Sequence, residues 1–290
     1  MIAKENFLDN VEEMLKLAAT RLPSDVVKAL EECKKSEDNP IAIQQFESIL
    51  ENLEIAEREE RPICQDTGIP IFFVKLGSEI DLDFDLNSVL KEAVRNATES
   101  VPLRPNVVDP LTRENPGDNT GENQPIIHLE IMPGEDLEID LMLKGAGSEN
   151  WSKLFTLKPT STSKDVKEII LKTIEEAGGQ PCPPTIVGVG IGGSADAASL
   201  LAKRALLRPL DEENEDEALA KLEKKITENA NKLGVGPMGL GGKNTVLGVK
   251  IAKAGCHTAS LPLAVNLQCW AARRSQARLV DDELEIEVPE

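Results

Sequence analysis

Apolar side chains recur at helical spacing through the first 58 residues of the chain. In the first stretch they stand three or four positions apart, at Phe7, Val11, Met14, Leu15 and Ala18, as on one face of an α-helix. A second run begins behind Ser24 and Asp25, residue types that cap helix N-termini, and a third lies between residues 41 and 53. The pattern predicts an N-terminal segment of three helices over residues 1–58.

The pattern changes at residue 69, where residues 69–76 are mostly β-branched or aromatic and predict a strand. Residues 86–100 return to helical spacing. Two further apolar runs, 126–131 and 137–143, are separated by Pro133-Gly134-Glu135-Asp136, which is typical of a turn. We therefore expect these two runs to form a β-hairpin.

The second half alternates between predicted helices and strands. Helices are expected at 163–177, from 194 to about 207 and at 211–233, and strands at 185–191 and 245–251. Residues 259–274 predict a buried helix or a strand–helix unit. The fold class expected is mixed α/β (α+β): a helical N-terminal segment, then a sheet region with flanking helices and long Gly/Pro-rich loops.

The overall charge narrows the possible partners. The chain has 290 residues, 40% of them hydrophobic, and a net charge of −19, which disfavours nucleic acid and anionic membranes as partners. No apolar run approaches the roughly 18 residues that a membrane span requires. The first residues, from Met1 to Asn6, lack the apolar core of a signal peptide. These features predict a cytoplasmic protein.

The five cysteines do not form a Cys-x-x-Cys pair, so thiols or metal ligands are expected rather than disulfides. Cys64 lies in a turn-forming stretch before a strand, and Cys182 is flanked by prolines, which make a rigid loop. Cys256 and Cys269 compete for a third position, and spacing does not choose between them. Cys33 lies at an exposed helix end and is interpreted as incidental.

The two histidines and one arginine differ in what their surroundings indicate. His128 lies in an alternating strand and is interpreted as structural, whereas His257 adjoins Cys256 near a chain reversal. Arg104 stands between two prolines at the head of a Pro-rich loop, residues 101–125. A guanidinium positioned in this way suits a carboxylate ligand.

Glycine-rich stretches raise two alternatives. Gly188–Gly193 matches the G-x-G-x-x-G pattern of dinucleotide sites, but the second strand ending in an acidic residue does not follow as that fold requires. Lys243, after the glycines of 234–242, precedes a strand rather than a helix, so a P-loop is not expected. A nicotinamide-dependent oxidoreductase and a non-catalytic module that binds zinc through its cysteines remain as alternatives.

Five segments in order resemble the iron–sulfur-dependent (class I) fumarate hydratase and L-tartrate dehydratase family. They cover most of residues 60–275: Cys64–Gly68, Lys144–Asn150, Cys182–Asp196, Gly236–Lys243 and Cys256–Pro262. Each glycine-rich piece alone would be a weak signal, but five in order are specific.

The resemblance implies a [4Fe–4S] cluster with one iron not ligated by protein. The implied ligands are Cys64, Cys182 and Cys269, which leaves Cys256 as a neighbour. It also implies that Asp66 and His257 are catalytic and that His257 contacts the substrate. Further substrate-binding residues implied are Gln65, Arg104 and Gly147. The Pro-rich and Gly-rich loops are expected to converge near the cysteines.

The resemblance further implies reversible hydration of fumarate to (S)-malate, with L-tartrate or mesaconate as alternative substrates. Single-chain members of the family are much longer, so this chain resembles the α subunit of the two-subunit form. A separate β subunit is then expected to supply the rest of the active site, within a higher hetero-oligomer that acts on a small dicarboxylate. Residues 1–290 are expected to form a single cluster-binding catalytic domain, with residues 59–290 as its cluster- and substrate-binding region.

Overall fold

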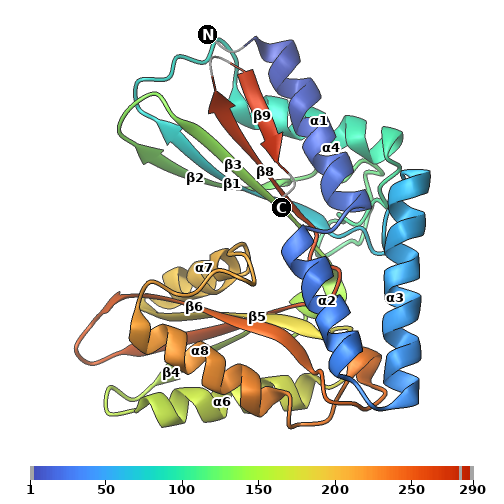
Figure 1. Ribbon diagram of the computed structural model, residues 1–290. Coiled ribbons are helices and arrows are strands. Elements are labelled where there is room, and N and C mark those ends of the chain that lie inside the picture. Colours follow the sequence, from blue (N-terminus) through green and yellow to red (C-terminus); the bar gives the residue numbers. More distant parts are fainter. Residues whose placement is uncertain (1–2, 281–282, 288–290) are drawn as a thin grey trace. The chain divides into compact units, whose positions relative to one another are not determined.

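The computed structural model describes residues 3–280 and 283–287. Its internal contacts divide the chain into two compact units, each built from separated segments and each with its own sheet (Figure 1). Unit 1 comprises Met1–Ser24, Asn52–Gly145 and Arg273–Glu290, and unit 2 comprises Asp25–Glu51 and Ala146–Ala272. That the chain forms one cluster-binding domain stays a prediction.

The N-terminal segment is helical, as its apolar periodicity predicted. The three helices are α1 (Lys4–Thr20), α2 (Ser24–Ser36) and α3 (Pro40–Glu59). The periodic apolar residues of α1, among them Phe7, Val11 and Met14, are fully buried. This burial explains why the spacing was informative, since most helical stability in proteins comes from packing of an apolar face.

Unit 1 contains a five-stranded sheet in the order β2-β1-β3-β8-β9. The strands are β1 (Ile69–Gly77), β2 (Ile126–Met132), β3 (Leu137–Lys144), β8 (Arg274–Val280) and β9 (Glu283–Glu287). Strand β1 pairs in parallel with β2 and antiparallel with β3.

The expected hairpin between residues 126–131 and 137–143 is therefore wrong, because β1 lies between β2 and β3. Strand β1 is buried along most of its length and takes the central position. Strand β2 lies at the edge, where Leu129 and Ile131 are 53% and 60% exposed.

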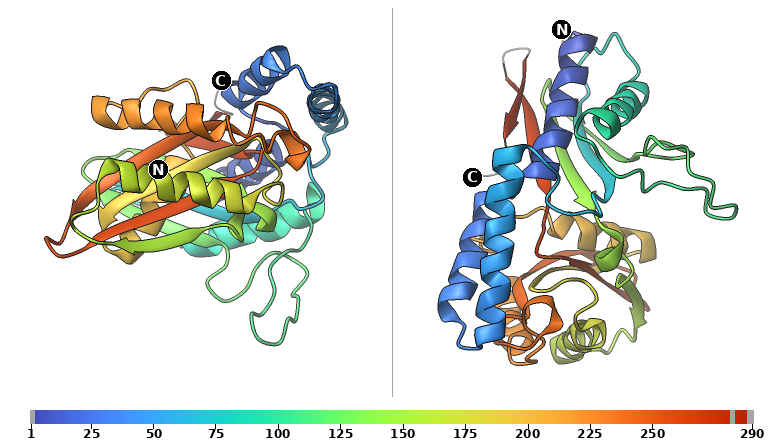
Figure 2. Two further views of the ribbon diagram at one scale, coloured as in Figure 1. Left: turned by 90° about the horizontal axis from the view of Figure 1, so that it is seen from below. Right: turned by 90° about the vertical axis from the view of Figure 1, so that its right-hand side faces the viewer.

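Helices α1 and α4 (Leu86–Ser100) cover one face of this sheet (Figure 1). Phe7 and Phe72 lie in the core between the helices and the strands. Helix α4 begins after Asp85, whose carboxylate accepts a hydrogen bond from the Ser88 N–H, a common N-terminal cap. The Pro-rich loop of residues 101–125 extends outward from this unit, as the right-hand view of Figure 2 shows.

Unit 2 contains a mixed four-stranded sheet in the order β4-β7-β5-β6. Its elements are α5 (Ala146–Glu149), β4 (Lys153–Leu157), α6 (Ser163–Ala177), β5 (Thr185–Gly193), α7 (Ala195–Ala205), α8 (Glu217–Ala230), the 3₁₀ turn η1 (Pro237–Gly239), β6 (Val246–Cys256) and β7 (Leu261–Gln268). Helix α7 lies on one face, and α6 and α8 lie on the other (Figure 1).

Residues 259–274 differ from the expected helix or strand–helix unit, because β7 is a strand and β8 begins at Arg274. A short run of buried apolar residues fits a core strand as well as a helix, and seven of the eight β7 residues are buried. The mixed α/β fold class with its helical N-terminal segment is confirmed.

The glycines of the G-x-G-x-x-G pattern serve the packing of α7 on β5. A Cβ atom on Gly188 would overlap the Ala202 carbonyl oxygen, and one on Gly190 would overlap that of Ala198. The helix backbone thus lies directly against the strand where side chains are absent. Strand β6 pairs in parallel with β5 and β7 pairs antiparallel with it, so among the described residues this sheet is mixed and differs from the parallel sheet that the nicotinamide alternative predicts.

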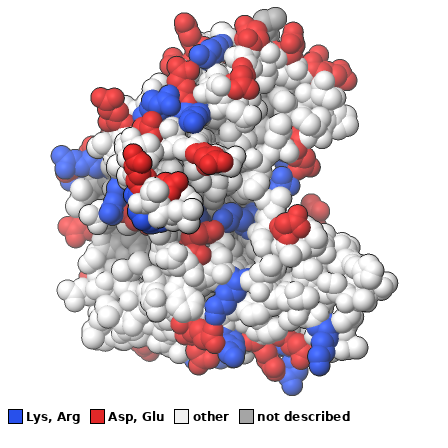
Figure 3. Space-filling model, turned by 180° about the vertical axis from the view of Figure 1, so that it is seen from behind, with Lys and Arg blue, Asp and Glu red and all other residues white. Residues whose placement is uncertain are grey.

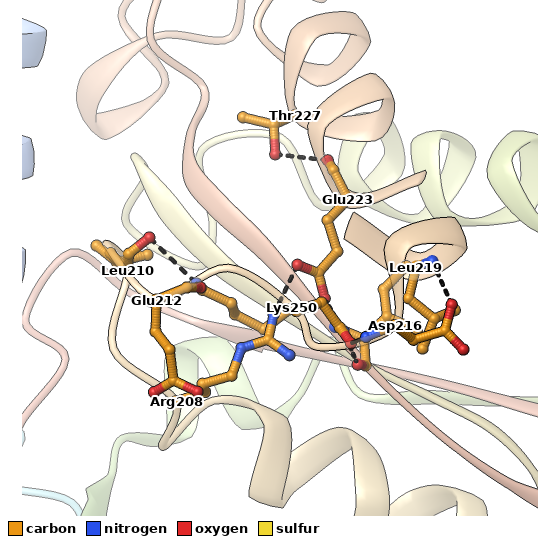
Figure 4. A network of polar contacts seen from close by, with 10 residues as sticks. Arg208, Leu210, Glu212, Asp216, Leu219, Glu223, Thr227 and Lys250 are labelled. Atoms are coloured by element: carbon orange, nitrogen blue, oxygen red, sulfur yellow. Dashed lines mark hydrogen bonds and ion pairs between the residues drawn. The ribbon is translucent and has the colours of Figure 1, made fainter. Parts of the chain in front are cut away.

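A polar network fixes the connection between α7 and α8 (Figure 4). The buried Lys250 Nζ donates to the carbonyl oxygens of Leu210 (3.1 Å) and Glu212 (2.7 Å). Glu223 accepts from the Arg208 guanidinium at both carboxylate oxygens, each at 2.6 Å. Burial, followed by the nearby Arg208 cation, lowers the pKa of Lys250 to about 8.

The acidic surface is partly neutralised by local pairing. Lys4 pairs with Glu92 (3.0 Å) in unit 1, and Lys34 pairs with Glu47 (3.2 Å) in unit 2. On the face shown in Figure 3, Asp and Glu are interspersed with Lys and Arg. The exclusion of nucleic acid stays a prediction. None of the helices in the described part of the chain has the length and apolarity that crossing a membrane would require.

Candidate functional site

The Cys64–Gly68 segment forms a bent loop that leads into β1. The Asp66 Oδ1 atom accepts hydrogen bonds from the Gly68 N–H (3.0 Å) and from Asn106 Nδ2 (3.2 Å). Gly68 adopts φ +82°, and a Cβ atom there would lie 2.8 Å from the backbone of Lys144. The loop therefore needs glycine at this position, and its carboxylate is held in place by two donors.

The Pro-rich loop brings Arg104 beside this segment. The Arg104 N–H donates to Thr67 Oγ1 (3.1 Å), and the Arg104 carbonyl accepts from Asn119 Nδ2 (3.0 Å). The Arg104 side chain is exposed, as is that of Gln65. Within unit 1, the expected substrate residues Gln65, Asp66 and Arg104 thus share one loop cluster.

Sequence reasoning missed Asn106 and Arg273 in this cluster. Asn106 Nδ2 also donates to the Gly68 carbonyl at 3.0 Å, so one amide bridges both ends of the Asp66 turn. Arg273 is 2% exposed, and its Nη1 donates to the Asp66 carbonyl oxygen at 2.6 Å. Among the described residues, Arg273 Nε has no hydrogen-bond partner.

The signal for Arg273 in the sequence was faint. It is one of two adjacent arginines that follow the apolar pair Ala271-Ala272, shortly after Cys269. Arginines are mostly exposed, so burial of this one is a property of the fold. Its Nη2 would lie 3.3 Å from a Cβ atom on Gly145, a position also 3.1 Å from Asp66 Oδ2.

In unit 2, Cys182 and Cys269 lie on neighbouring loops. The Cys182 carbonyl accepts a hydrogen bond from the Trp270 N–H at 3.2 Å, next to Cys269. Cys182 has φ +53°, an uncommon conformation for a residue other than glycine, and both cysteines are half-buried. The structure therefore brings together two cysteines that are far apart in sequence.

Two glycine-containing segments of unit 2 lie against the Cys182 loop. The Met238 N–H donates to the Pro183 carbonyl at 2.8 Å. A Cβ atom on Gly147, within α5, would lie 3.4 Å from the Gln180 carbonyl oxygen. Within unit 1 the Pro-rich loop thus contacts the Cys64 segment, and within unit 2 these glycine segments contact the Cys182 loop. Convergence of all these loops on one site stays a prediction.

His257 lies elsewhere in unit 2, in the exposed connection between β6 and β7. Its Nδ1 accepts a hydrogen bond from the Ala259 N–H at 3.1 Å. In the neutral ring the proton therefore lies on Nε2. Strand β7 separates this residue from Cys269, so unit 2 does not bring His257 to the cysteine pair.

Cys33 and Cys256, which were not predicted to be ligands, differ from each other in exposure. Cys256 is exposed at the end of β6. Burial, followed by the charges of Glu32 and Glu37, raises the pKa of the Cys33 thiol to about 12. Cys33 is half-buried rather than exposed, and a thiol with so high a pKa is a poor ligand or nucleophile.

The donor set fits an iron–sulfur cluster in its chemistry. None of the five cysteines, all of which are described, is in a disulfide, and soft thiolates are the usual ligands of such clusters. Cys64 belongs to unit 1, and Cys182 and Cys269 belong to unit 2. Within the described ranges, no three residues of the types His, Cys, Asp or Glu form a ready metal-binding group, and the ligand set stays a prediction.

Comparisons with known proteins agree with the motif resemblance. The family model described as fumarate hydratase (Fumerase) matches residues 8–278. A Methanocaldococcus jannaschii protein named "Putative L(+)-tartrate dehydratase subunit alpha" is 50% identical over 275 residues, which are 93% of this chain and 96% of that protein. The L(+)-tartrate dehydratase subunit alpha of Escherichia coli K12 is 37% identical over 259 residues, covering 89% and 86% of the two chains. The chain therefore belongs to the fumarate hydratase (Fumerase) family.

Proposed function

We propose that the chain is the α subunit of a [4Fe–4S]-dependent hydro-lyase that acts on a small dicarboxylate. A separate β subunit completes its active site. The family description names a hydratase, and the printed names of the relatives describe the α subunit of a dehydratase. Both names describe the addition or removal of water at a dicarboxylate.

The observation that carries the proposal is the joining of the Cys182 and Cys269 loops by the Trp270 N–H. Cysteine thiolates are the usual ligands of iron–sulfur clusters; in the proposal, the two cysteines on these contacting loops bind one cluster, and Cys64 is its third ligand. When bound, a cluster with one iron not ligated by protein supplies a Lewis acid for the hydroxyl group that leaves.

The residues of unit 1 then bind and orient the substrate. The exposed Arg104 guanidinium pairs with a substrate carboxylate, which offsets the repulsion expected from a chain of net charge −19. Gln65 offers its amide to the same ligand. The Asp66 carboxylate is oriented by hydrogen bonds from Gly68 and Asn106. In the proposal it accepts a proton or a hydrogen bond from the substrate.

Two residues of unit 2 complete the proposed shell. The Gly147 backbone, close to the Cys182 loop, allows near approach of the ligand. His257 presents Nε2–H as a donor and is the second catalytic group of the proposal. The β subunit supplies the remaining cations and the base that the family resemblance implies.

L-Tartrate is the first substrate to test, because the relatives' names specify L(+)-tartrate. The family description keeps fumarate as the second, and fumarate was the expectation from the sequence motifs. Mesaconate is the third. These compounds or their hydrated forms share two carboxylates and a hydroxyl group beside one of them, so the same residues suit each.

The experiment is co-expression of this chain with a candidate β subunit, followed by anaerobic reconstitution and a substrate panel. We expect turnover of L-tartrate, or of fumarate and malate, by the complex and little turnover by this chain alone. Inactivity of the reconstituted complex on the whole panel would contradict the proposed reaction. Full activity of this chain alone would contradict the need for a β subunit.

A further inference from the structure

The short helix α5 carries Gly147 and is too short to fix its own position. It has four residues, and isolated helices of this length are not stable in water. The turn is closed by its backbone, for example where the Asn150 N–H donates to the Ala146 carbonyl at 2.9 Å. The place of Gly147 in unit 2 therefore depends on the contacts that α5 makes with other elements.

A helix and a strand of unit 2 hold α5 through one carboxylate, that of Glu149. Lys203 Nζ, on α7, donates to Glu149 Oε1 at 2.6 Å, and Asn266 Nδ2, on β7, donates to Glu149 Oε2 at 3.2 Å. Asn266 Nδ2 also donates to Ser152 Oγ at 2.6 Å, just beyond α5. We call Glu149, Lys203 and Asn266 the α5 clamp. The clamp connects the α5 turn to both layers of unit 2, the sheet and a covering helix.

The close packing of α7 on the sheet brings Lys203 within reach of Glu149. A Cβ atom on Gly188, in β5, would lie 2.1 Å from the Ala202 carbonyl oxygen, so the end of α7 needs a glycine beneath it. Gly188 pairs in register with Asn266 on β7, and α7 also packs on β7. The helix turn that carries Lys203 therefore lies beside the strand position that carries Asn266. The G-x-G-x-x-G segment thus has a role that requires no nucleotide.

The clamp contains a buried polar atom that folding alone does not explain. Asn266 is 4% exposed, and its Oδ1 has no hydrogen-bond partner among the described residues. A buried polar atom without a partner lowers stability, and an apolar side chain at this position would avoid that loss. The Lys203 side chain is also largely buried, at 17% exposure. These costs are accounted for if the two side chains serve to orient Glu149.

The surroundings of α5 show what would happen without the clamp. A cavity of about 270 Å³ lies beside it, lined by Glu149, Lys203 and Asn266 together with Ser199 of α7. A Cβ atom on Gly147 would lie 3.4 Å from the Gln180 carbonyl oxygen, in the loop that leads to Cys182. A released α5 turn would have room to shift into the cavity, and Gly147 would move relative to that loop.

We propose that the α5 clamp positions the Gly147 backbone for substrate binding. Lys203 and Asn266 are positioning residues that act through Glu149 and do not touch the substrate. This inference rests on the proposed function, which places Gly147 in the substrate shell. Loss of the clamp then weakens substrate binding more than it slows the chemical step, because the clamp holds a binding contact and no reacting group.

Kinetics of the reconstituted complex test the proposal. Lys203→Met is expected to raise KM by about tenfold, the factor that corresponds to loss of one charge-assisted hydrogen bond, with a smaller change in kcat. Lys203→Arg, which keeps a cation, should restore part of the loss. Iron and sulfide content should match wild type, because the Cys182 and Cys269 loops are joined by their own hydrogen bond. A Lys203→Met complex with the KM of an active wild type, or one that loses its iron, overturns the positioning role.

A double variant separates positioning from direct binding of the substrate by Lys203. We expect Glu149→Leu to raise KM as Lys203→Met does, and the double variant to be no worse than either alone, as for residues in one network. If Lys203 bound the anion directly, removal of the Glu149 carboxylate would lower KM, which would contradict the proposal. The matched control is Lys221→Met, which removes the same charge from an exposed pair with Glu217 on α8 and should leave KM unchanged.

Hydrogen exchange gives a readout that does not depend on turnover. The amides of residues 150–152 donate to carbonyl oxygens of the α5 turn, and they should exchange faster in the Lys203→Met complex than in wild type or Lys221→Met. If wild type turns over nothing on the substrate panel, the proposed reaction fails, and faster exchange still supports the clamp. Exchange of these amides at the wild-type rate in Lys203→Met overturns the positioning role, whatever the activity.

Discussion

Asp66 is held from both its side chain and its backbone. Gly68 and Asn106 donate to its carboxylate, and the buried Arg273 donates to its carbonyl. The family resemblance implied a role for Asp66, and the flanking prolines together with the resemblance indicated Arg104. These signals could not point to Arg273, since the burial of an arginine depends on strands that meet only in the fold. The residue that orients the loop was therefore the one least visible in the sequence.

Replacing Arg273 tests this orientation. We expect Arg273→Met to lower kcat of the reconstituted complex by about 10²-fold, the scale of an effect from slight misplacement of a catalytic group. Hydrogen exchange of residues 63–69 should become faster, because the Asp66 carbonyl loses its donor. Arg273→Lys, which keeps a cation and a donor, should recover part of both effects.

The matched control is Arg208→Met, which removes a half-buried guanidinium from the Glu223 network. It should lower stability without changing exchange at residues 63–69. Unchanged exchange in Arg273→Met would contradict the positioning role, whatever the activity.

Lys250 gives a pH dependence of stability with a definite sign. Its pKa in the folded chain is about 8, below its usual value of 10.5. Between these values the unfolded chain binds more protons, so the free energy of unfolding should rise with pH by at most about 1.4 kcal/mol per pH unit.

Urea unfolding from pH 7 to 10 measures this contribution as the difference between wild type and Lys250→Met. The difference should change across pH 8 to 10. For Lys224→Met, an exposed lysine on α8, we expect no such change. If the difference in unfolding free energy between wild type and Lys250→Met did not change with pH, the charged form of Lys250 would not be destabilised by burial.

At the scale of elements, local periodicity identified most helices and strands, whereas pairing was not predictable. The three helices within residues 4–59 follow from apolar spacing and from the capping residue types at Ser24 and Asp25. The predicted hairpin of β2 and β3 is wrong because β1, which comes much earlier in the chain, lies between these two strands and pairs with both. For residues 259–274 the sequence left a buried helix or a strand–helix unit open, because a short run of buried apolar residues does not distinguish a strand from a helix; β7 matches only the strand of the second alternative.

The contact between α7 and β5 allows a prediction at this scale. Gly190→Ala would place a methyl group on the Ala198 carbonyl oxygen, and we expect a loss of about 1–3 kcal/mol of unfolding free energy from overpacking. Gly255→Ala is the control, since its Cβ atom would meet nothing within 4 Å, and its effect should stay within about 0.5 kcal/mol. Equal stabilities in chemical denaturation would contradict the close contact.

At the scale of the whole molecule, the chain is built from two interleaved units, an organisation that the sequence did not indicate. Unit 1 gathers three separated segments, the last of which follows Cys269 by only a few residues. The motifs are therefore divided: Cys64, Asp66 and Arg104 belong to unit 1, and Cys182, Cys269 and His257 belong to unit 2. The proposed ligand set therefore includes residues of both units.

The iron and sulfide content of cysteine variants tests the central proposal most directly. Each of the five cysteines is replaced by serine, and the chain, co-expressed with its β subunit, is reconstituted anaerobically. We predict a full [4Fe–4S] content in wild type, Cys33→Ser and Cys256→Ser, and its loss in Cys64→Ser, Cys182→Ser and Cys269→Ser. A Cys64→Ser or Cys269→Ser protein that keeps the full cluster, or a Cys256→Ser protein that loses it, would contradict the account.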